Sequence, residues 1–170
     1  MLNRIESSTM KNPQPVDLRS LISGAAERWL PYAHERNIDL GFALESARMQ
    51  GEPVWLEEMV NNLVDNALRY TPQYGTVTVK CGQFEGAAWL SVEDSGPGIP
   101  QTERERIFER FYRSHPERGE GSGLGLAIVG EVANTHRAKI EVIDSEELGG
   151  ALIRVVFPAG SPDISSTRQE

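Results

Sequence analysis

Hydrophobic residues recur at two spacings along this chain, and the wider spacing indicates which segments form helices. Apolar residues three or four positions apart predict a helix after Asp17, a favourable N-cap residue, and a second helix over residues 53–70. A third helix is expected over residues 124–135, where a glycine-rich run ends. Pro31 should kink or interrupt the first helix, because proline has no backbone N–H and its ring clashes with the preceding turn.

Short runs in which apolar residues alternate, or stand together between turn residues, predict strands. We expect strands at residues 38–44, 76–79, 88–92, 139–144 and 151–157. The second and third of these are separated by glycines and should form an antiparallel pair, and a turn over residues 146–150 should join the last two. Runs of strands with helices between them indicate an α/β sandwich, with one mixed, mainly antiparallel sheet and helices on one face.

The chain is predicted to form one domain with a short segment on each side. Residues 1–15 read as the end of a preceding helix followed by a proline-containing linker. The domain itself should cover residues 16–158, and residues 159–170 form a polar tail that is expected to be disordered. A total length of 170 residues suits one domain of this kind.

Composition narrows the classes of function. The formal net charge is −8, which argues against a nucleic-acid-binding protein, because phosphate contacts need clustered Lys and Arg. No apolar run approaches the roughly 18 residues that span a bilayer. Residues 1–10 contain no apolar stretch that would indicate a signal peptide. The single cysteine, Cys81, cannot form an internal disulfide, which fits a reducing cytosol.

The predicted helix over residues 53–70 contains Asn61, Asn62 and Asn66, which an ordinary solvent-exposed face would not need. Asn62, Asn66 and Arg69 should lie on one polar strip, because residues three and four apart share a face of a helix. The carbonyl of asparagine suits a hard cation such as Mg2+, and its amide can donate to phosphate. The strip could therefore hold a metal–triphosphate, with a plain solvated face as the alternative.

Two glycine-rich segments indicate a ligand that approaches the backbone closely. Asp94 follows a strand directly and precedes Gly96 and Gly98, so its carboxylate could accept from an exocyclic amine. Residues 119–125 have glycine at every second position and then open a helix, whose N-terminal N–H groups suit phosphate. An ordinary capped loop and a flexible linker are the alternatives for these segments. No glycine is followed by lysine, which excludes a P-loop.

Five segments, taken in order, resemble the sensor histidine kinases, within the superfamily that also contains gyrase-type ATPases and heat-shock chaperones. They are NNLVDNALRYTP, DSGPGIP, IFERFYR, GSGLGLAIV and GGALIRVVFP. Their order resembles the N box, first glycine box, F box, second glycine box and final strand of that family, over roughly residues 16–158. The resemblance implies a Bergerat-type fold that binds ATP and Mg2+, with an ATP lid over about residues 98–121.

The resemblance also implies roles for individual residues. Asn66 would coordinate Mg2+, Asn62 would lie beside the phosphates, and Asp94 would accept from the adenine amine. Arg69 would reach the phosphates and Tyr70 would lie beside the adenine. We expect catalysis to depend on Asn62, Asn66 and Arg69. The remaining nucleotide contacts are expected from Gly96, Gly98, Ile99, Phe111, Gly121, Ser122, Gly123, Leu124, Gly125 and Leu126.

The sequence departs from the family in two places. Ala151 stands where the family often has threonine, so a hydroxyl near the adenine carboxylate is missing. The phosphoacceptor motif, a His-Glu or His-Asp pair on a helix, is not found in this chain. We interpret His34, His115 and His136 as surface or structural residues. The resemblance therefore implies that the dimerisation and phosphoacceptor domain is missing here.

As a whole, the resemblance implies the cytoplasmic catalytic domain of a homodimeric sensor kinase anchored in the inner membrane. It would transfer the γ-phosphoryl group of ATP to a histidine of its dimerisation domain, and the group would then pass to a response regulator. Gyrase-like relatives have a water-activating glutamate where this chain has Asn62, which argues against an ATPase that drives conformational change. The alternatives are a stand-alone serine kinase of the anti-sigma-factor type and a non-catalytic nucleotide-sensing module.

Overall fold

The computed structural model describes residues 10–112 and 124–160 of the chain. The described elements, in chain order, are β1 (Gln14–Asp17), α1 (Leu18–Glu35), β2 (Asp39–Leu44), β3 (Arg48–Gly51), α2 (Pro53–Tyr70), β4 (Thr76–Phe84), β5 (Ala87–Asp94), η2 (Gln101–Glu103), η3 (Arg106–Phe108), α3 (Gly125–Thr135), β6 (Lys139–Asp144) and β7 (Ala151–Val156). The predicted helix remnant at the N-terminus and nearly all of the predicted tail lie outside the described residues.

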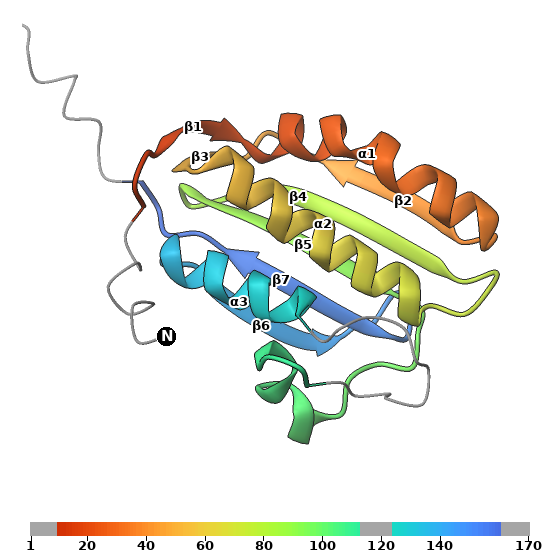
Figure 1. Cartoon of the computed structure of the whole chain (residues 1–170). Coiled ribbons are helices and arrows are strands. Elements are labelled where there is room, and N and C mark those ends of the chain that lie inside the picture. The colour runs from red at the N-terminus through yellow and green to blue at the C-terminus, as the bar shows by residue number, and fades with distance from the viewer. Residues whose placement is uncertain (1–9, 113–123, 161–170) are drawn as a thin grey trace, which may run out of the picture.

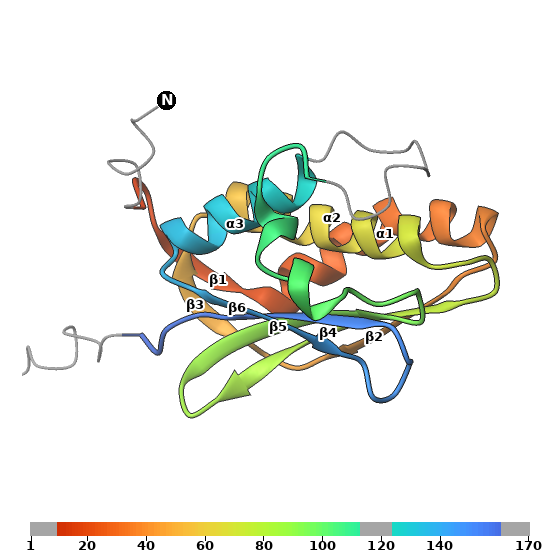
Figure 2. The same cartoon turned by 90° about the horizontal axis from the view of Figure 1, so that it is seen from below.

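A five-stranded sheet in the order β2-β4-β5-β7-β6 forms one layer of the described molecule. Strand β2 runs parallel to β4, whereas the other neighbouring strands in this sheet are antiparallel. Helices α1, α2 and α3 lie side by side on one face of the sheet (Figure 1). Figure 2 shows the two layers edge on, with the helices above the strands. The predicted α/β sandwich with a mixed, mainly antiparallel sheet is confirmed.

The hydrophobic core lies between the sheet and the helices. Helix α2 turns an apolar stripe toward the sheet, and its buried side chains are Leu56, Met59, Val60, Leu63, Val64, Ala67 and Leu68. They belong to one core with inward-facing residues of the central strands, such as Val79, Leu90 and Val155. Burying a side chain of this size contributes about 1.5–3 kcal/mol. The apolar stripe therefore fixes the rotation of α2, and with it the direction of the polar strip.

The hairpin between β4 and β5 extends further than the hydrophobic pattern predicts. Its turn consists of Glu85 and Gly86, with φ values of 50° and 82°. Two left-handed residues in succession match a type I′ turn, whose twist suits that of the flanking strands. Gly82 does not end β4, because it lies opposite Trp89 in the pairing of the two strands. A Cβ atom on Gly82 would lie only 3.1 Å from the Trp89 ring.

One expectation for the N-terminal part is wrong, and of the two effects expected of Pro31 the interruption is not found. Residues 14 and 15, predicted to be linker, belong to β1, which pairs antiparallel with β3. Pro31 lies inside α1 and does not interrupt it. Proline removes the N–H partner of the Glu27 carbonyl, but both residues are exposed on the outer side of the helix. Water can therefore bond to that carbonyl, and the helix continues.

The ends of the helices agree with the sequence signals. The carboxylate of Asp17 accepts a hydrogen bond from the Arg19 N–H at 3.0 Å and caps α1, as predicted. Helix α2 has the predicted bounds, and α3 begins one residue later than predicted, at Gly125. Within the part of the chain that the structure describes, no helix has both the length and the apolar character to cross a membrane.

Candidate functional site

The polar strip of α2 lies on the side of the helix away from its buried stripe. Asn62, Asn66 and Arg69 are each partly exposed. The side-chain amide of Asn62 donates to the Glu58 carbonyl oxygen at 2.8 Å, which fixes the direction of its Oδ1 atom. Arg69 Nε lies 3.2 Å from Asp65 Oδ2, one turn earlier on the helix. The strip thus presents amide and guanidinium groups of one helix toward the same side.

Asn61 does not belong to this strip, and its side chain contacts α1 instead. Its Oδ1 atom accepts a hydrogen bond from the Trp29 indole Nε1 at 2.9 Å, which joins α2 to α1. A buried indole N–H needs such a partner, because an unpaired donor in the core is costly. Trp29 also stacks on Phe42 of β2, with ring centroids 6.3 Å apart. Asn61 is therefore a structural residue.

Asp94 lies at the end of β5, and backbone N–H groups from two directions hold its carboxylate. Oδ1 accepts from the Gly96 N–H at 2.9 Å and from the Ala151 N–H at 3.3 Å. The Asp94 carbonyl oxygen accepts from the Gly150 N–H at 3.0 Å. Burial raises the pKa of the Asp94 carboxyl, and the bonds from Gly96 and Ala151 oppose this shift only in part. The result is a fixed, largely desolvated acceptor.

Glycines allow the elements around Asp94 and Asn62 to approach closely. A Cβ atom on Gly96 would lie 2.9 Å from the Tyr70 carbonyl oxygen, at the end of α2. On Gly150 it would lie 2.4 Å from Asp94 Oδ1, and on Gly125 it would lie 3.0 Å from Asn62 Oδ1. Distances near or below 3 Å leave no room for a side chain. The N box, the first glycine box and the start of α3 therefore meet in one region.

The segment after the first glycine box lies against α3 and β6. Gly98 has a φ of 77°, which a glycine adopts without strain. Ile99 and Phe108 pack against the core, and Ile107 is buried. Arg104 donates to the Ile99 carbonyl at 3.1 Å, to the Val142 carbonyl at 3.3 Å and to Asp144 Oδ1 at 2.8 Å. Arg104 cannot be singled out from the sequence, because one arginine in a charged loop gives no signal of these contacts.

Phe111 differs from Phe108, the other phenylalanine of the F box. It is 69% exposed and has a φ of 65°, so its ring is not packed in the core. Its neighbour Tyr112 donates to a Glu103 carboxylate oxygen, and the Arg106 guanidinium lies 4.7 Å from the Tyr112 ring centroid. Of the two phenylalanines, Phe108 packs on the core and Phe111 does not.

The second glycine box is described only from its last residues. Gly121, Ser122 and Gly123 lie outside the described residues. Leu124 and Leu126 are partly buried, and Leu126 packs against the core. Helix α3 starts at Gly125, so its first turn has backbone N–H groups without partners inside the helix. Such groups and the positive end of the helix dipole suit a phosphate.

The three histidines were interpreted as surface or structural residues. His136 is buried: its Nε2 atom accepts from the Glu52 N–H at 3.1 Å, and Nδ1 lies 2.8 Å from the Val132 carbonyl oxygen. It therefore joins the end of α3 to the start of α2 as a structural residue. His34 is exposed near the end of α1. His115 lies outside the described residues.

The donors and acceptors in this region fit a magnesium nucleotide. Asn62 and Asn66 offer oxygen atoms to a hard cation and N–H groups to phosphate. The absence of a side chain on Gly125 lets Asn62 Oδ1 approach the start of α3 closely. Two N–H groups use Oδ1 of Asp94, and a carboxylate has further lone pairs that can accept from an exocyclic amine. The chemistry at both ends of the region therefore suits one ligand with a base and phosphates.

The sequence is similar to curated sensor kinases. A family model described as histidine kinase-, DNA gyrase B-, and HSP90-like ATPase matches residues 51–161. Sensor protein kinase PmrB of Pseudomonas aeruginosa is 39% identical over 150 residues, which cover 88% of this chain and 31% of PmrB. Sensor histidine kinase CusS of Escherichia coli is 35% identical over 130 residues, which cover 75% of this chain and 27% of CusS. The chain thus spans about a third of the length of these relatives.

Solved structures give the same result. The mycobacterial sensor histidine kinase MprB has a TM-score of 0.76 and 35% identity, over 89% of this chain and 100% of the MprB chain. Full-length ShkA, solved in complex with AMPPNP, has a TM-score of 0.77 and 26% identity, over 95% of this chain and 35% of its own. The chain belongs to the histidine kinase-, DNA gyrase B- and HSP90-like ATPase family, and it corresponds to the catalytic ATP-binding domain of two-component sensor histidine kinases.

Proposed function

We propose that this chain transfers the γ-phosphoryl group of ATP to a histidine on a dimerisation domain of the same longer protein. The observation that carries the proposal is that α2 contacts both other parts of the site: Asn62 lies against Gly125 at the start of α3, and the Tyr70 carbonyl lies against Gly96, which donates to Asp94. The complex of the related ShkA with AMPPNP, an analogue of ATP, supports the choice of nucleotide. The names of the curated relatives support the choice of reaction.

Each part of the site would hold a different part of the nucleotide. Asp94 would accept from the adenine amine, and the aromatic ring of Tyr70 would lie beside the base. Asn62, Arg69 and the first N–H groups of α3 would bind the phosphates. Asn66 would hold Mg2+, which supplies neutralisation of phosphate charge when bound. Every one of these roles is electrostatic or positional, as phosphoryl transfer requires.

The chemical step itself needs little from this domain. A lone pair on a neutral imidazole nitrogen of the acceptor attacks the γ-phosphorus in line. A nitrogen–phosphorus bond forms, the bond from phosphorus to the bridging oxygen breaks, and ADP leaves with the electron pair. Neutral imidazole is nucleophilic near pH 7 without a general base. Asn62 cannot take a proton from water, so the site would favour transfer to histidine over hydrolysis.

The rest of the pathway lies outside this chain. The phosphoryl group would pass from the histidine to an aspartate on a response regulator. The longer protein would be a homodimer anchored in the inner membrane, with this domain in the cytoplasm. The lengths of PmrB and CusS support this part of the proposal, since each continues well beyond the matched region.

A chimaera tests the reaction. This chain would replace the matched region in full-length Pseudomonas aeruginosa PmrB. With γ-labelled ATP and Mg2+, we expect label on the chimaera that is lost in acid and stable in base, as for phosphohistidine. The chain alone should bind ADP but take up no label. Acid-stable label on the chain or on an added protein would contradict the histidine kinase and favour the serine kinase.

A further inference from the structure

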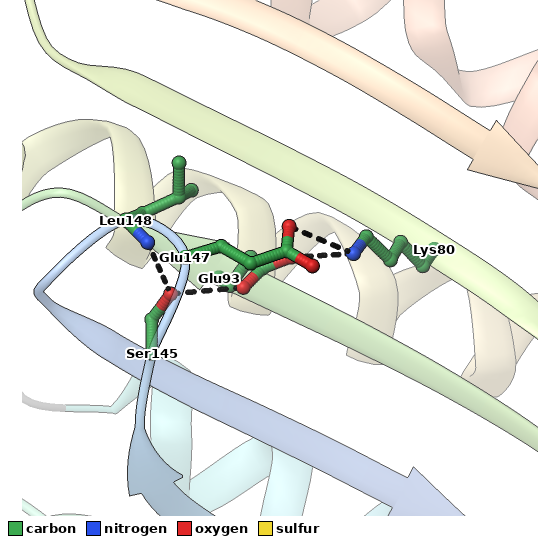
Figure 3. Close-up of polar contacts among 5 residues, drawn as sticks. All are labelled: Lys80, Glu93, Ser145, Glu147 and Leu148. Atoms are coloured by element: carbon green, nitrogen blue, oxygen red, sulfur yellow. Dashed lines mark hydrogen bonds and ion pairs between the residues drawn. The ribbon is translucent and has the colours of Figure 1, made fainter.

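A buried carboxylate lies directly beside Asp94 in the sequence but on the other face of the sheet. Glu93 is 2% exposed. Successive side chains of a strand point to opposite faces, so Glu93 points away from the helices when Asp94 points toward them. Figure 3 shows the Glu93 side chain in front of the strands, with the helices behind them. Nothing in the proposed nucleotide contacts uses Glu93.

The partners of Glu93 come from β4 and from the turn between β6 and β7. Lys80 Nζ lies 2.9 Å from Glu93 Oε1, and the Ser145 hydroxyl donates to Glu93 Oε2 at 2.9 Å. Lys80 also lies 3.4 Å from Glu147 Oε2, and the Leu148 N–H donates to the Ser145 hydroxyl oxygen at 2.9 Å (Figure 3). Two oxygens of one buried carboxylate thus hold two different elements.

The same turn carries the backbone groups that hold Asp94. The Ser145 N–H donates to the Gly150 carbonyl at 2.8 Å, and the Gly149 N–H donates to the Ser145 carbonyl at 2.8 Å. Gly150 then donates to the Asp94 carbonyl, and Ala151 donates to Asp94 Oδ1. The contacts therefore run from Glu93 through Ser145 and the turn to the carboxylate on the other face.

The turn over residues 145–150 can move only slightly relative to Asp94. A Cβ atom on Gly150 would lie 2.3 Å from the Asp94 carbonyl oxygen and 2.4 Å from its Oδ1 atom, so the two backbones are already in close contact. The bond from Ala151 to Oδ1 is 3.3 Å long, near the limit of a hydrogen bond. A small shift of the turn would therefore break this bond and leave Oδ1 with the Gly96 N–H as the other donor, so the carboxylate would be held from one direction and not from two.

Stability alone does not account for this ion pair, in which Glu93 is buried and Lys80 is partly exposed. Removing two charges from water costs about as much as their attraction returns, and apolar replacements are often equally stable. Glu93 raises the pKa of the Lys80 ammonium, so this partner stays charged across the neutral range. What the pair adds is a fixed direction for both Glu93 oxygens, and one of these oxygens holds the turn.

We propose that Glu93, with Lys80 and Ser145, positions the turn over residues 145–150 against Asp94 and thereby sets how well the site distinguishes adenine from guanine. This inference rests on the proposed function, in which Asp94 reads the base. Glu93 and Ser145 touch no nucleotide in this proposal and act only through Asp94. Their loss should therefore affect base recognition more than phosphate binding.

The test compares ADP and GDP binding in four variants of the chain by calorimetric titration with Mg2+. Ser145→Ala removes the hydroxyl, Ser145→Thr keeps it, and Glu93→Gln removes the charge. Glu141→Gln is the matched control, because Glu141 pairs with Arg154 at 3.3 Å without contact to the turn. We expect Ser145→Ala and Glu93→Gln to weaken ADP binding about fivefold, as for one lost hydrogen bond. GDP binding, Ser145→Thr and Glu141→Gln should stay near wild type.

The outcomes separate this inference from the proposed function. If wild type prefers ADP and Ser145→Ala keeps the same ratio of ADP to GDP affinity, the positioning role is overturned while base reading by Asp94 stands. An equal loss for both nucleotides, with a lower melting temperature, would also overturn it, because it indicates a merely structural role. A wild type that binds ADP and GDP equally would contradict Asp94 as the base reader and both proposals. Ser145→Ala removes a single oxygen, so it decides the matter even if Glu93→Gln fails to fold.

Discussion

The buried Asp94 carboxylate destabilises the folded state, and in the proposed site it accepts a hydrogen bond from adenine. Burial raises the pKa of its carboxyl above the ordinary value, so folding disfavours the ionised form. Above the raised folded-state pKa the group is ionised in both states, and the cost is present in full. As the pH falls through the raised pKa toward the unfolded value, the native state takes up the proton first and the cost is relieved.

We predict that Asp94→Asn stabilises the nucleotide-free fold at pH 7 and weakens ADP binding. The Asn carbonyl can still accept from the Gly96 and Ala151 N–H groups, so the loop stays in place. An amide is a poorer acceptor for adenine, and the loss should be about 1–3 kcal/mol, or about tenfold to a hundredfold in affinity. Thermal unfolding and calorimetry measure the two effects. A lower melting temperature together with unchanged ADP binding would contradict both parts.

We predict that Asn66→Ala removes phosphoryl transfer in the chimaera but leaves the domain folded. Asn66 is partly exposed on the polar strip of α2, so its loss opens no cavity in the core. The matched control is Asn61→Ala, which removes the partner of the Trp29 indole N–H. This control should lower the free energy of unfolding by about 1–3 kcal/mol, the cost of an unpaired buried donor, and should keep transfer. Normal transfer by Asn66→Ala would show that the metal assignment is wrong.

At the scale of single residues, the sequence indicates which chemical groups are available, but it does not indicate which partners each side chain contacts. Asn61 and Asn62 are neighbours of the same type, yet one holds Trp29 and the other lies beside Gly125. Helical spacing could place them on different faces, but it could not show that an indole from another helix would reach Asn61. Arg104 was missed for the same reason, since its partners Ile99, Val142 and Asp144 come from distant parts of the chain.

At the scale of elements, Asp17 holds two segments together. Its Oδ1 atom accepts from Arg19 at the start of α1 and from the Ala47 N–H, and Oδ2 accepts from the Ser46 hydroxyl. The bond from Ala47 is the largest cause of the lowered pKa of Asp17, and burial opposes it. A carboxyl with a lowered pKa contributes stability at neutral pH, which is lost as the pH falls through the folded-state pKa.

We predict that Asp17→Ala lowers the free energy of unfolding by about 1–2 kcal/mol at pH 7, as for the loss of an N-cap. Urea unfolding should show the difference between variant and wild type shrinking as the pH falls below the ordinary range for aspartate, because wild type then loses the same bonds. Asp17→Asn keeps one acceptor oxygen and should fall between the two. A difference that stays constant down to pH 2 would contradict the assignment to the ionised carboxylate.

The elements that the sequence predicts are those with one buried face. The α2 pattern gives its bounds correctly, because its buried and exposed sides differ along the whole helix. Strands β1 and β3 have no such pattern, since the residues of β3 are Arg-Met-Gln-Gly and only Gly51 is buried. Their pairing depends on backbone hydrogen bonds between segments far apart in the chain. The spacing of apolar side chains does not show which backbone segments pair, so it could not predict β1 and β3.

At the scale of the whole molecule, Arg104 connects the segment after the first glycine box to the edge of the sheet. Its three hydrogen bonds fix residues 99–104 against β6 before any nucleotide binds. Beyond them, residues 109–112 make fewer contacts with the core, and Phe111 is exposed. Sequence resemblance gave one lid over residues 98–121. Within the described part of this range, residues 98–112, Arg104 holds the first part against β6, and Glu109, Arg110 and Phe111 are exposed.

We predict that Arg104→Gln speeds hydrogen exchange at residues 99–108 and weakens ADP binding. The guanidinium makes contacts with two backbone carbonyls and one carboxylate, which an amide cannot reproduce together. The segment would then be ordered only when nucleotide binds, and this ordering entropy would be subtracted from the binding free energy. Mg-ADP should restore slow exchange in the variant. Glu105→Gln, an exposed neighbour, is the control and should change neither quantity. Exchange in Arg104→Gln that matches wild type without nucleotide would show that the base of the segment is held by Ile107 and Phe108 and not by Arg104.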